Sequence, residues 1–309
     1  MARAAADDRP QIRGVGISHP DRVIYPELKL TKLDLARYYE AMAELMLPHV
    51  ADRPLTLVRC PDGVDGTGGS GCFYMKHSKL WAPPALRRVR IREKTKVGEY
   101  LVADSAAALV SLVQMGILEV HTWNSTCADL ERPNRVVLDI DPGESVRWPA
   151  VIAAARLIRD LLRGLDLVSF VKTTGGRGLH VVVPLAPRAD WTECLEFAKA
   201  IALALVRRDP RAFTVDFSKE RRSGKLLIDY LRNNRTNTSV AAYSTRANPA
   251  ATVSVPLEWR ELSASREPGR YTIATIANRV ARRGTDPWRE YWTTKQDLPR
   301  AAVTALNRM

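Results

Sequence analysis

Residues 136–144 read VVLDIDPGE, a run of β-favouring residues that meets two acids and stops at Pro-Gly. Such a run is typical of a buried strand that ends in a turn. Because side chains alternate along a strand, Leu138 and Ile140 share one face while Asp139 and Asp141 share the other. The stretch therefore predicts a strand whose apolar face packs on a core and whose two carboxylates lie together near its end.

The Asp139/Asp141 pair predicts a cation site. Like charges about 6–7 Å apart repel unless a cation lies between them. A hard divalent ion held by oxygen ligands suits two carboxylates. A strand end with two solvated acids explains an isolated Asp-x-Asp pattern equally well, so features elsewhere in the chain must decide.

The composition indicates a protein with a polyanionic partner. The 309 residues are 46% hydrophobic, enough for one large domain or two small ones. Lys and Arg total 47 against 34 Asp and Glu, and this net charge of +13 favours a nucleic acid or another polyanion. No apolar run of about 18 residues and no signal-peptide core are found, so we expect a cytoplasmic location and no membrane association.

The four cysteines are scattered without a Cys-x-x-Cys pair. They are Cys60, Cys72, Cys127 and Cys194. Zinc sites commonly use close cysteine pairs, and disulfides are rare in the cytoplasm. We therefore expect four reduced, structural thiols and no zinc site.

Helical and strand patterns alternate along residues 13–309, which we expect to form one domain after a loose tail of residues 1–12. Capping boxes at 31–34 (TKLD) and 190–193 (DWTE) predict helices that run to Pro48 and to about residue 208. Apolar periodicity predicts further helices over 105–114, 149–163 and 273–282, and strands over 55–60, 117–123, 168–172, 179–185 and 226–231.

Two segments carry groups suited to phosphate or metal. In the turn 173–178 (TTGGRG), glycines let backbone N–H groups approach an anion, Thr174 and Arg177 offer donors, and His180 follows. An ordinary hairpin turn is the alternative. Asp229 lies in the middle of an apolar strand, where a carboxylate must be hydrogen-bonded, paired or bound to a metal.

Aromatic and polar residues elsewhere suit a nucleotide. Tyr74 follows Phe73 and lies beside Lys76, as a base-stacking platform with a phosphate contact requires, although two aromatics in a strand are more often core. His121 shares a strand face with Glu119, and it suits a ligand or, more commonly, a structural hydrogen bond.

Two loops complete the pattern. Five glycines within residues 63–71 predict a mobile surface loop. Residues 218–225 (SKERRSGK) form a basic loop that is either solvated or in contact with a nucleic-acid backbone.

Together the three acids, His180 and the basic turn favour nucleotidyl transfer onto a nucleic acid. Two divalent ions on such carboxylates activate an attacking hydroxyl and neutralise a leaving pyrophosphate. A glycosyltransferase, whose Asp-x-Asp holds manganese on a nucleotide sugar, accounts for neither the basicity nor Asp229. A nucleic-acid-binding module without catalytic activity does not explain why Asp229 lies in an apolar strand.

The chain resembles the polymerase domain of bacterial DNA ligase D, a member of the archaeo-eukaryotic primase superfamily that serves non-homologous end joining. The likeness covers about residues 14–299. The motifs that carry it are DRVIYP (21–26), RPL (53–55), FYMKH (73–77), VLDIDPGE (137–144), GGRGLH (175–180), IDYLRN (228–233), VAAYSTRA (240–247) and VSVPLEW (253–259).

The resemblance implies an α/β domain with a central mixed or antiparallel sheet flanked by helices, a primase-like catalytic core whose acids lie in a cleft. It implies a nucleoid-associated polymerase that adds NTPs or dNTPs to DNA with a gap, an overhang or a double-strand break and a 5′-phosphate. Ku and a DNA ligase are the implied protein partners. The alternatives are a DNA-end-tethering module with little catalysis and a primase of another pathway.

The resemblance also implies roles for individual residues. The metals, Mn²⁺ or Mg²⁺, are expected on Asp139, Asp141 and Asp229. Nucleotide contacts are expected from Tyr74, Lys76, His121, Thr174, Arg177, His180, Arg232 and Arg246. DNA contacts, including a 5′-phosphate pocket formed by the first two, are expected from Arg22, Lys32, Arg59, Arg221 and Arg222.

Two positions depart from the family pattern. Thr174 is found where the family usually has Ser, and Arg177 where it often has Lys. Because Arg is a planar fork and Lys a point charge, we expect the phosphate geometry to differ at Arg177.

Overall fold

The computed structural model describes residues 9–64, 71–78, 81–218 and 220–308. They fall into two compact units. Unit 1 comprises the described residues of 1–121 together with 243–251, and unit 2 comprises those of 122–242 and 252–309. The prediction that residues 13–309 form one domain stays a prediction.

Two short strands lie near the start of the described residues. Strand β1 (Gln11–Ile12) pairs antiparallel with β2 (Val15–Gly16), and Ile12 is buried. Residues 1–8 of the predicted tail lie outside the described residues. Residues 11–12 of that tail thus form a strand, and the predicted boundary after residue 12 stays a prediction.

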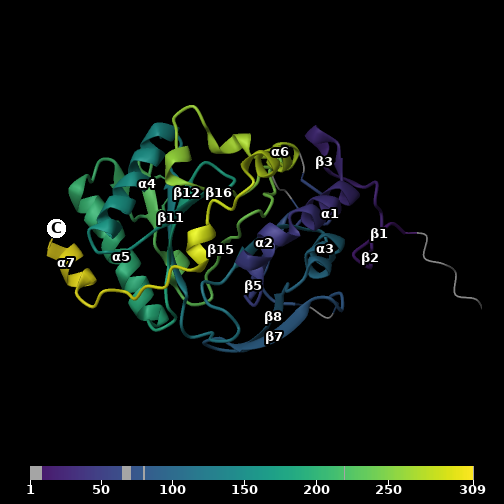
Figure 1. Ribbon diagram of the computed structural model, residues 1–309, viewed down its shortest axis with the longest axis horizontal. Coiled ribbons are helices and arrows are strands. Elements are labelled where there is room, and N and C mark those ends of the chain that lie inside the picture. The colour runs from purple at the N-terminus through teal and green to yellow at the C-terminus, as the bar shows by residue number, and fades with distance from the viewer. Residues whose placement is uncertain (1–8, 65–70, 79–80, 219, 309) are drawn as a thin grey trace, which may run out of the picture. The chain divides into compact units, whose positions relative to one another are not determined.

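Unit 2 is built on a six-stranded sheet with the strand order β13-β14-β10-β12-β11-β16. Figure 1 labels β11, β12 and β16 of this sheet. All neighbouring pairs in it are antiparallel except β13 and β14, so the sheet is mixed, as predicted. The strands are β10 (Arg135–Pro142), β11 (Phe170–Thr173), β12 (Leu179–Pro184), β13 (Phe213–Thr214), β14 (Leu226–Asp229) and β16 (Pro256–Leu257).

Strand β10 is the predicted central strand, and its apolar face is core. Leu138 and Ile140 are fully buried. Helices α4 (Trp148–Arg163) and α5 (Trp191–Arg208) pack against β10, and the predicted capping box of α5 at Asp190 is present. On the sheet, Val137 joins an aromatic-rich buried cluster with Phe170, Val182, Trp288 and Tyr291.

The remaining elements of unit 2 are short apart from one helix. They are η2 (Leu231–Asn233), β15 (Ser239–Val240), η3 (Trp259–Glu261), η4 (Pro268–Arg270), α6 (Ile273–Arg283), η5 (Arg289–Trp292) and α7 (Ala302–Arg308). Helix α7 packs on α5.

Unit 1 combines three helices with small sheets. Strand β5 lies between β9 and β6, while β3 pairs with β4 and β7 with β8. The further elements are β3 (Val23–Tyr25), η1 (Pro26–Leu28), β4 (Leu30–Thr31), α1 (Lys32–Ala41), α2 (Ala43–Val50), β5 (Leu55–Arg59), β6 (Phe73–Met75), β7 (Arg87–Arg92), β8 (Val97–Val102), α3 (Ala106–Gln114) and β9 (Ile117–Thr122).

The predicted helix from residue 31 to Pro48 is two helices. The capping box between Thr31 and Asp34 is present, but α1 ends at Ala41 and Pro48 lies inside α2 instead of ending a helix. Proline has no backbone N–H, so the carbonyl of Glu44, four residues earlier in α2, receives no helical hydrogen bond from position 48. No helix of the described residues is long and apolar enough to cross a membrane.

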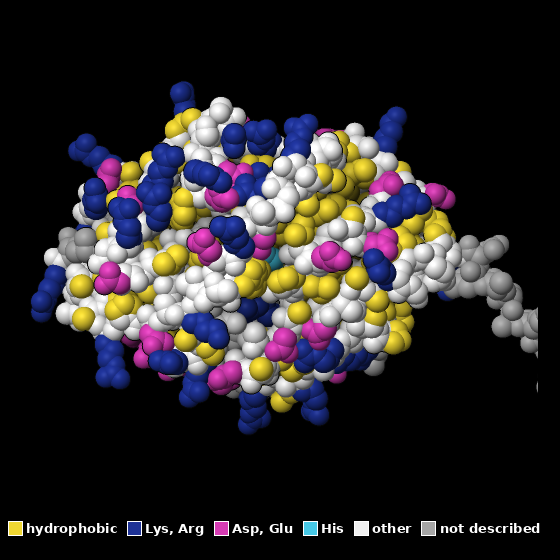
Figure 2. Space-filling view, in the orientation of Figure 1, with side chains coloured by type: hydrophobic (Ala, Val, Ile, Leu, Met, Phe, Trp, Pro, Cys, Tyr) yellow, Lys and Arg dark blue, Asp and Glu magenta, His cyan; other side chains and the backbone are white. Residues whose placement is uncertain are grey.

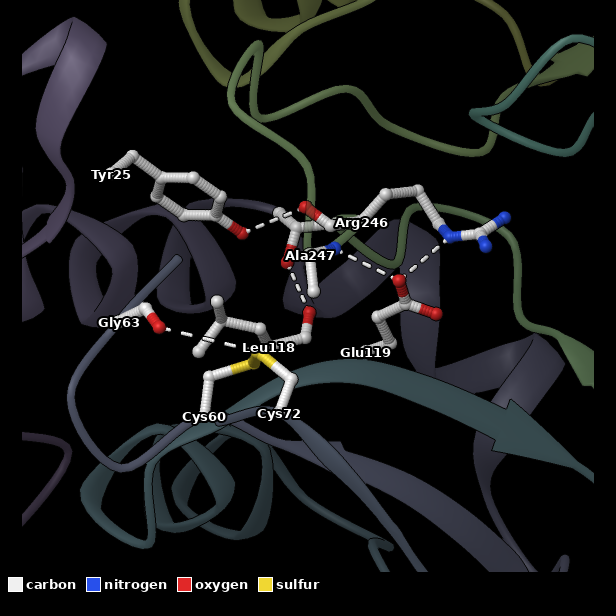
Figure 3. Close-up of a disulfide and its surroundings, with 9 residues drawn as sticks. Tyr25, Cys60, Gly63, Cys72, Leu118, Glu119, Arg246 and Ala247 are labelled. Carbon is white, nitrogen blue, oxygen red and sulfur yellow. Dashed lines mark hydrogen bonds and ion pairs between the residues drawn. A yellow bond between two sulfur atoms is a disulfide. The ribbon is translucent and has the colours of Figure 1, made fainter. Parts of the chain in front are cut away.

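The prediction of four reduced cysteines is wrong, because Cys60 and Cys72 form a disulfide (Figure 3). Strands β5 and β6 are antiparallel, with Arg59 opposite Phe73. The next residues outward, Cys60 and Cys72, therefore face each other, with 4.2 Å between their Cα atoms. Cys127 and Cys194 are free thiols.

The disulfide closes the glycine-rich loop at its base. Of the loop predicted over 63–71, residues 65–70 lie outside the described residues, so the prediction of a mobile loop stays a prediction. Only 12 positions separate the two cysteines, and hairpin pairing rather than a Cys-x-x-Cys motif brings them together.

Candidate active site

Four titratable side chains form a row across the unit 2 sheet, which we call the polar row. Strand pairing places Asp229 opposite Asp139, Asp139 opposite His180, and His180 opposite Lys172. Directly opposed residues on neighbouring strands share a face of the sheet. The sheet therefore brings together two of the predicted metal ligands and the predicted phosphate-binding histidine.

The polar row is buried and shares one guanidinium. Asp139 and Asp229 are each only 7% exposed. Arg232 Nε lies 3.0 Å from an Oδ2 atom of each carboxylate, and His180 Nε2 lies 3.4 Å from Asp139 Oδ1. Like charges are thus held close in a poorly solvated place, which is costly unless positive charge compensates them.

The pKa values along the polar row diverge for this reason. Burial raises the pKa of Asp139, but His180 and Arg232 outweigh burial and hold that pKa well below its usual range. Burial raises the pKa of Asp229 to about 6, because Arg232 compensates it only in part. Burial and then the charge of Lys172 lower the pKa of His180 to about 4.

The donor set of the polar row fits a divalent cation. Two carboxylates share a single positive group, and the buried Nδ1 of His180 has no hydrogen-bond partner among the described residues. Carboxylate oxygens are the ligands that Mn²⁺ and Mg²⁺ prefer. Within the described ranges, no three His, Cys, Asp or Glu side chains are already gathered in the geometry of a metal site.

The third predicted ligand, Asp141, is engaged elsewhere. Its Oδ2 lies 2.5 Å from NH1 of Arg222, a residue predicted to bind DNA. Arg222 is only 18% exposed at its side chain. Asp141 is therefore on the predicted face of β10 but is neutralised by the basic loop that follows β13.

Asp229 is the last residue of its strand, whereas the sequence predicts a position in the middle of one. β14 stops at Asp229, and η2 follows at Leu231–Asn233, so that Arg232 turns back onto the two carboxylates. Asn233 is fully buried and locks this turn to β10: its carboxamide accepts from Val137 N at 2.8 Å and donates to Val137 O at 2.7 Å.

The glycine-rich turn packs tightly against β10. A Cβ on Gly178 would lie 2.2 Å from the Ile140 carbonyl oxygen, so only glycine fits there. Thr174 Oγ1 accepts a hydrogen bond from Gly176 N at 3.2 Å. Arg177 NH2 donates to backbone carbonyls, those of Gly143 at 3.1 Å and of the next residue at 3.0 Å among them, and thereby ties the turn to the loop after β10.

Unit 1 holds a second charged cluster around Glu119 (Figure 3). Glu119 is 5% exposed and lies 2.8 Å from His121 Nε2 and 2.9 Å from Arg246 Nε. It also accepts a hydrogen bond from Ala247 N at 2.8 Å, while Tyr25 donates to the Arg246 carbonyl. The predicted nucleotide-binding residues His121 and Arg246 are thus held by one carboxylate.

The predicted stacking platform is exposed. Tyr74 and Phe73 are 68% and 47% exposed, which rules out the alternative that both are core residues. They line a pocket of about 640 Å³ together with Arg59 and Lys76. Arg59 lies 5.9 Å from the Phe73 ring centroid, a distance typical of a cation–π contact.

Lys76 and the predicted DNA-binding residues have protein partners of their own. Lys76 Nζ lies 3.8 Å from Glu93. Arg22 donates to the Pro61 carbonyl, and Lys32 is buried with its ammonium 2.8 Å from Gln114 Oε1. Burial and then the charge of Arg22 lower the pKa of Lys32 to about 8.

Arg221 remains on the surface of its loop. Its side chain is 75% exposed and lies 3.0 Å from Asp216. The face shown in Figure 2 carries many Lys and Arg side chains, consistent with the net charge of +13.

Three residues of these clusters were missed from the sequence alone. Lys172 and Asn233 are ordinary members of their segments, and only strand pairing and the η2 turn place them at the polar row. Glu119 was noted only as a neighbour of His121. The sequence signal for Glu119 is the strand face that it shares with His121. Its ion pair with Arg246 joins residues 127 positions apart, which no local pattern predicts.

The chain matches a known protein family over most of its length. Residues 31–288 match the family model described as LigD, primase-polymerase domain. The multifunctional non-homologous end joining protein LigD of Pseudomonas aeruginosa is 39% identical over 306 residues, which are 99% of this chain and 36% of that protein. The Mycobacterium tuberculosis LigD protein is 34% identical over 280 residues, 87% of this chain and 36% of its own length.

The fold agrees with a solved relative. The solved structure of the polymerase domain from Mycobacterium tuberculosis ligase D in complex with DNA matches with a TM-score of 0.82 and 33% identity. The match covers 92% of this chain and 99% of that one. The chain spans about a third of the length of the curated relatives it matches, and it belongs to the family of LigD primase-polymerase domains.

Proposed function

We propose that this chain is a metal-dependent nucleotidyltransferase that adds ribo- or deoxyribonucleotides to a DNA primer end in non-homologous end joining, by templated gap filling and end extension. The observation that carries this proposal is the polar row. Asp139 and Asp229 face each other on neighbouring strands and share Arg232. Membership of a primase-polymerase family, and a relative solved with DNA, support the proposal.

The polar row supplies the ligands that such a reaction needs. Asp139 and Asp229, with Asp141 once it leaves Arg222, are the residues that would hold Mn²⁺ or Mg²⁺. When bound, two such ions would lower the pKa of an attacking hydroxyl and neutralise the charge of a leaving pyrophosphate.

Basic side chains beside the row would orient the nucleotide. Arg232 is 39% exposed at its side chain, so it can exchange its contact with the two carboxylates for a triphosphate oxygen. His180, whose Nε2 lies 3.4 Å from Asp139 Oδ1, is a second side chain that would contact the triphosphate. In unit 1, the exposed ring of Tyr74 offers a face on which a base would stack.

The binding partners are proposed on the same grounds. The substrate is DNA with a gap, an overhang or a double-strand break, and Arg22 with Lys32 would hold a 5′-phosphate. Ku and a DNA ligase are the proposed protein partners, since the relatives are non-homologous end joining proteins.

The test is the isosteric variant Asp229→Asn in a primer-extension assay with manganese on gapped DNA. We expect extension to be lost, because the variant removes the negative charge that would hold the cation but keeps the shape of the side chain. The matched control is Asp297→Asn, which changes a half-exposed aspartate of unit 2 that pairs with Arg188. Manganese binding, followed by electron paramagnetic resonance, should weaken only in Asp229→Asn.

Two outcomes would contradict the proposal. Extension by Asp229→Asn at the wild-type rate would remove the polar row from the chemistry. Wild-type protein that binds gapped DNA and bridges DNA ends but never extends a primer would favour the end-tethering module instead.

A further inference from the structure

Helix α6 and the loop before it line an open surface cavity that none of the functions above uses. Its volume is about 1080 Å³, and five of its twelve lining residues are arginines. One lining residue, Glu267, is acidic. We call this space the arginine cavity; it lies within unit 2 and shares no residue with the polar row. Its arginines are Arg266, Arg270, Arg279, Arg282 and Arg283.

Two of the arginines are held by carboxylates behind the cavity wall. Arg279 NH1 lies 2.7 Å from Glu261 Oε1, and Arg283 NH1 lies 2.8 Å from Glu261 Oε2. Arg283 also pairs with Glu258. Glu261 is 7% exposed, so both of these guanidinium groups are held by a buried carboxylate.

A third arginine is fixed by an aromatic ring. Tyr271 is 5% exposed, and the guanidinium groups of Arg279 and Arg270 lie 5.1 Å and 5.9 Å from its ring centroid. Both distances are within the range of cation–π contacts. The Tyr271 ring thus contacts two guanidinium groups and is not available for stacking on a base.

The charge of the other arginines is not balanced within the lining. Arg266 and Arg282 are exposed, as is Arg270. Against these three cations the lining offers only Glu267, which leaves a surplus of about two positive charges. On α6, Asn278 and Arg282 lie one turn apart on the face that also carries Thr275, so the helix presents a polar face to the cavity.

We propose that the arginine cavity binds the phosphate groups of a nucleic-acid backbone, as a DNA contact additional to the nucleotidyl-transfer site. Guanidinium forks match phosphate oxygens in geometry and charge. Because five of the twelve lining residues are arginines and the one aromatic ring is already covered by guanidinium groups, we expect the contacts to go mainly to phosphates and to be largely independent of sequence. An acidic protein segment is less well suited, since Ala264 and Tyr271 are the main apolar groups it would find there.

The test compares Arg266→Ala/Arg282→Ala with wild type in the whole 309-residue chain. Equilibrium binding to a fluorescent blunt duplex is measured by anisotropy over a series of salt concentrations, and circular dichroism confirms the fold. We expect roughly tenfold weaker binding at low salt. The slope of log K against log salt should be less steep by about 1.8, since each lost phosphate contact contributes about 0.9.

The matched control is Arg208→Ala/Arg300→Ala, which also removes two exposed arginines of unit 2 but none from the cavity. We expect its salt slope to equal that of wild type. Equal slopes for wild type and the cavity variant would overturn the proposal. So would a cavity variant that loses binding to a poly-glutamate peptide but not to DNA, because an acidic protein would then be the ligand.

The proposed nucleotidyl transfer and the proposed DNA contact are tested by separate measurements. Asp229→Asn reports on primer extension, and the cavity variant reports on duplex affinity measured without added nucleotide or divalent metal, so that no extension can occur. A failure of one proposal therefore leaves the other measurement intact.

Discussion

Replacement of Glu119 by Gln tests the charged cluster that holds Arg246 and His121. Glu119 is 5% exposed and receives contacts from both side chains and from Ala247 N. Gln keeps the shape of the side chain but removes the negative charge. Arg246 and His121 would then lie in a poorly solvated place without their shared counterion.

The expected loss of stability follows from the pKa of Glu119. Burial raises this pKa, but His121 and Arg246 outweigh burial and lower it from 4.5 to about 2. One pKa unit corresponds to about 1.4 kcal/mol, so the charged form contributes about 3 kcal/mol at neutral pH. Because the folded pKa lies below the unfolded one, this contribution is present above pH 4.5 and is lost as the pH falls toward 2.

The assay is urea-induced unfolding of wild type and Glu119→Gln at pH 7 and at about pH 3.5. We expect a difference in the free energy of unfolding of about 3 kcal/mol at pH 7 that narrows by about 1 kcal/mol at the lower pH. The control is Glu40→Gln, whose half-exposed ion pair with Arg13 at 2.8 Å should contribute less than about 1 kcal/mol. Equal losses for the two variants at pH 7, or a gap that widens in acid, would refute the reasoning.

Three further predictions concern a buried amide, the disulfide and the DNA end. Asn233→Ala should lower the free energy of unfolding by about 3 kcal/mol, because the buried backbone groups of Val137 in β10 lose their hydrogen bonds. Chemical denaturation measures this, and a decrease below about 1 kcal/mol would contradict the prediction. Thiol titration of the denatured protein should find two free thiols before reduction and four after it, since Cys60 and Cys72 are bonded; four at the outset would disprove the disulfide. Gapped DNA with a 5′-phosphate should bind more tightly than the same DNA with a 5′-hydroxyl, and Arg22→Ala/Lys32→Ala should remove the advantage, which salt should also weaken. A titration in which the double variant keeps the whole preference would place the phosphate elsewhere.

Local patterns predicted local structure well. The alternation in residues 136–144 predicted a strand with one apolar face, and β10 is that strand. The capping boxes at Thr31 and Asp190 both form, because a side chain and a backbone N–H three residues apart meet whatever the rest of the chain does. The family motifs likewise depend on short segments, and the fold agrees with them.

Local patterns failed where a distant segment supplies the partner. The disulfide was missed because the pairing of β5 with β6 brings Cys60 opposite Cys72. Asp141 reads as a free ligand in its strand, yet Arg222 neutralises it from a loop 81 positions away. A spacing rule that considers one segment at a time predicts neither the disulfide nor the ion pair.

The sequence by itself determined the main strands and helices around the site and which residue types carry the chemistry, because these depend on neighbours a few positions apart. It did not indicate β7 and β8 or the break between α1 and α2. Only the tertiary structure decided which of those residues meet. The polar row takes Asp139, Lys172, His180 and Asp229 from four strands, and the order of those strands in the sheet sets their contacts. That order reflects the packing of the whole sheet and its helices, a long-range free energy to which every strand contributes and which no single strand encodes.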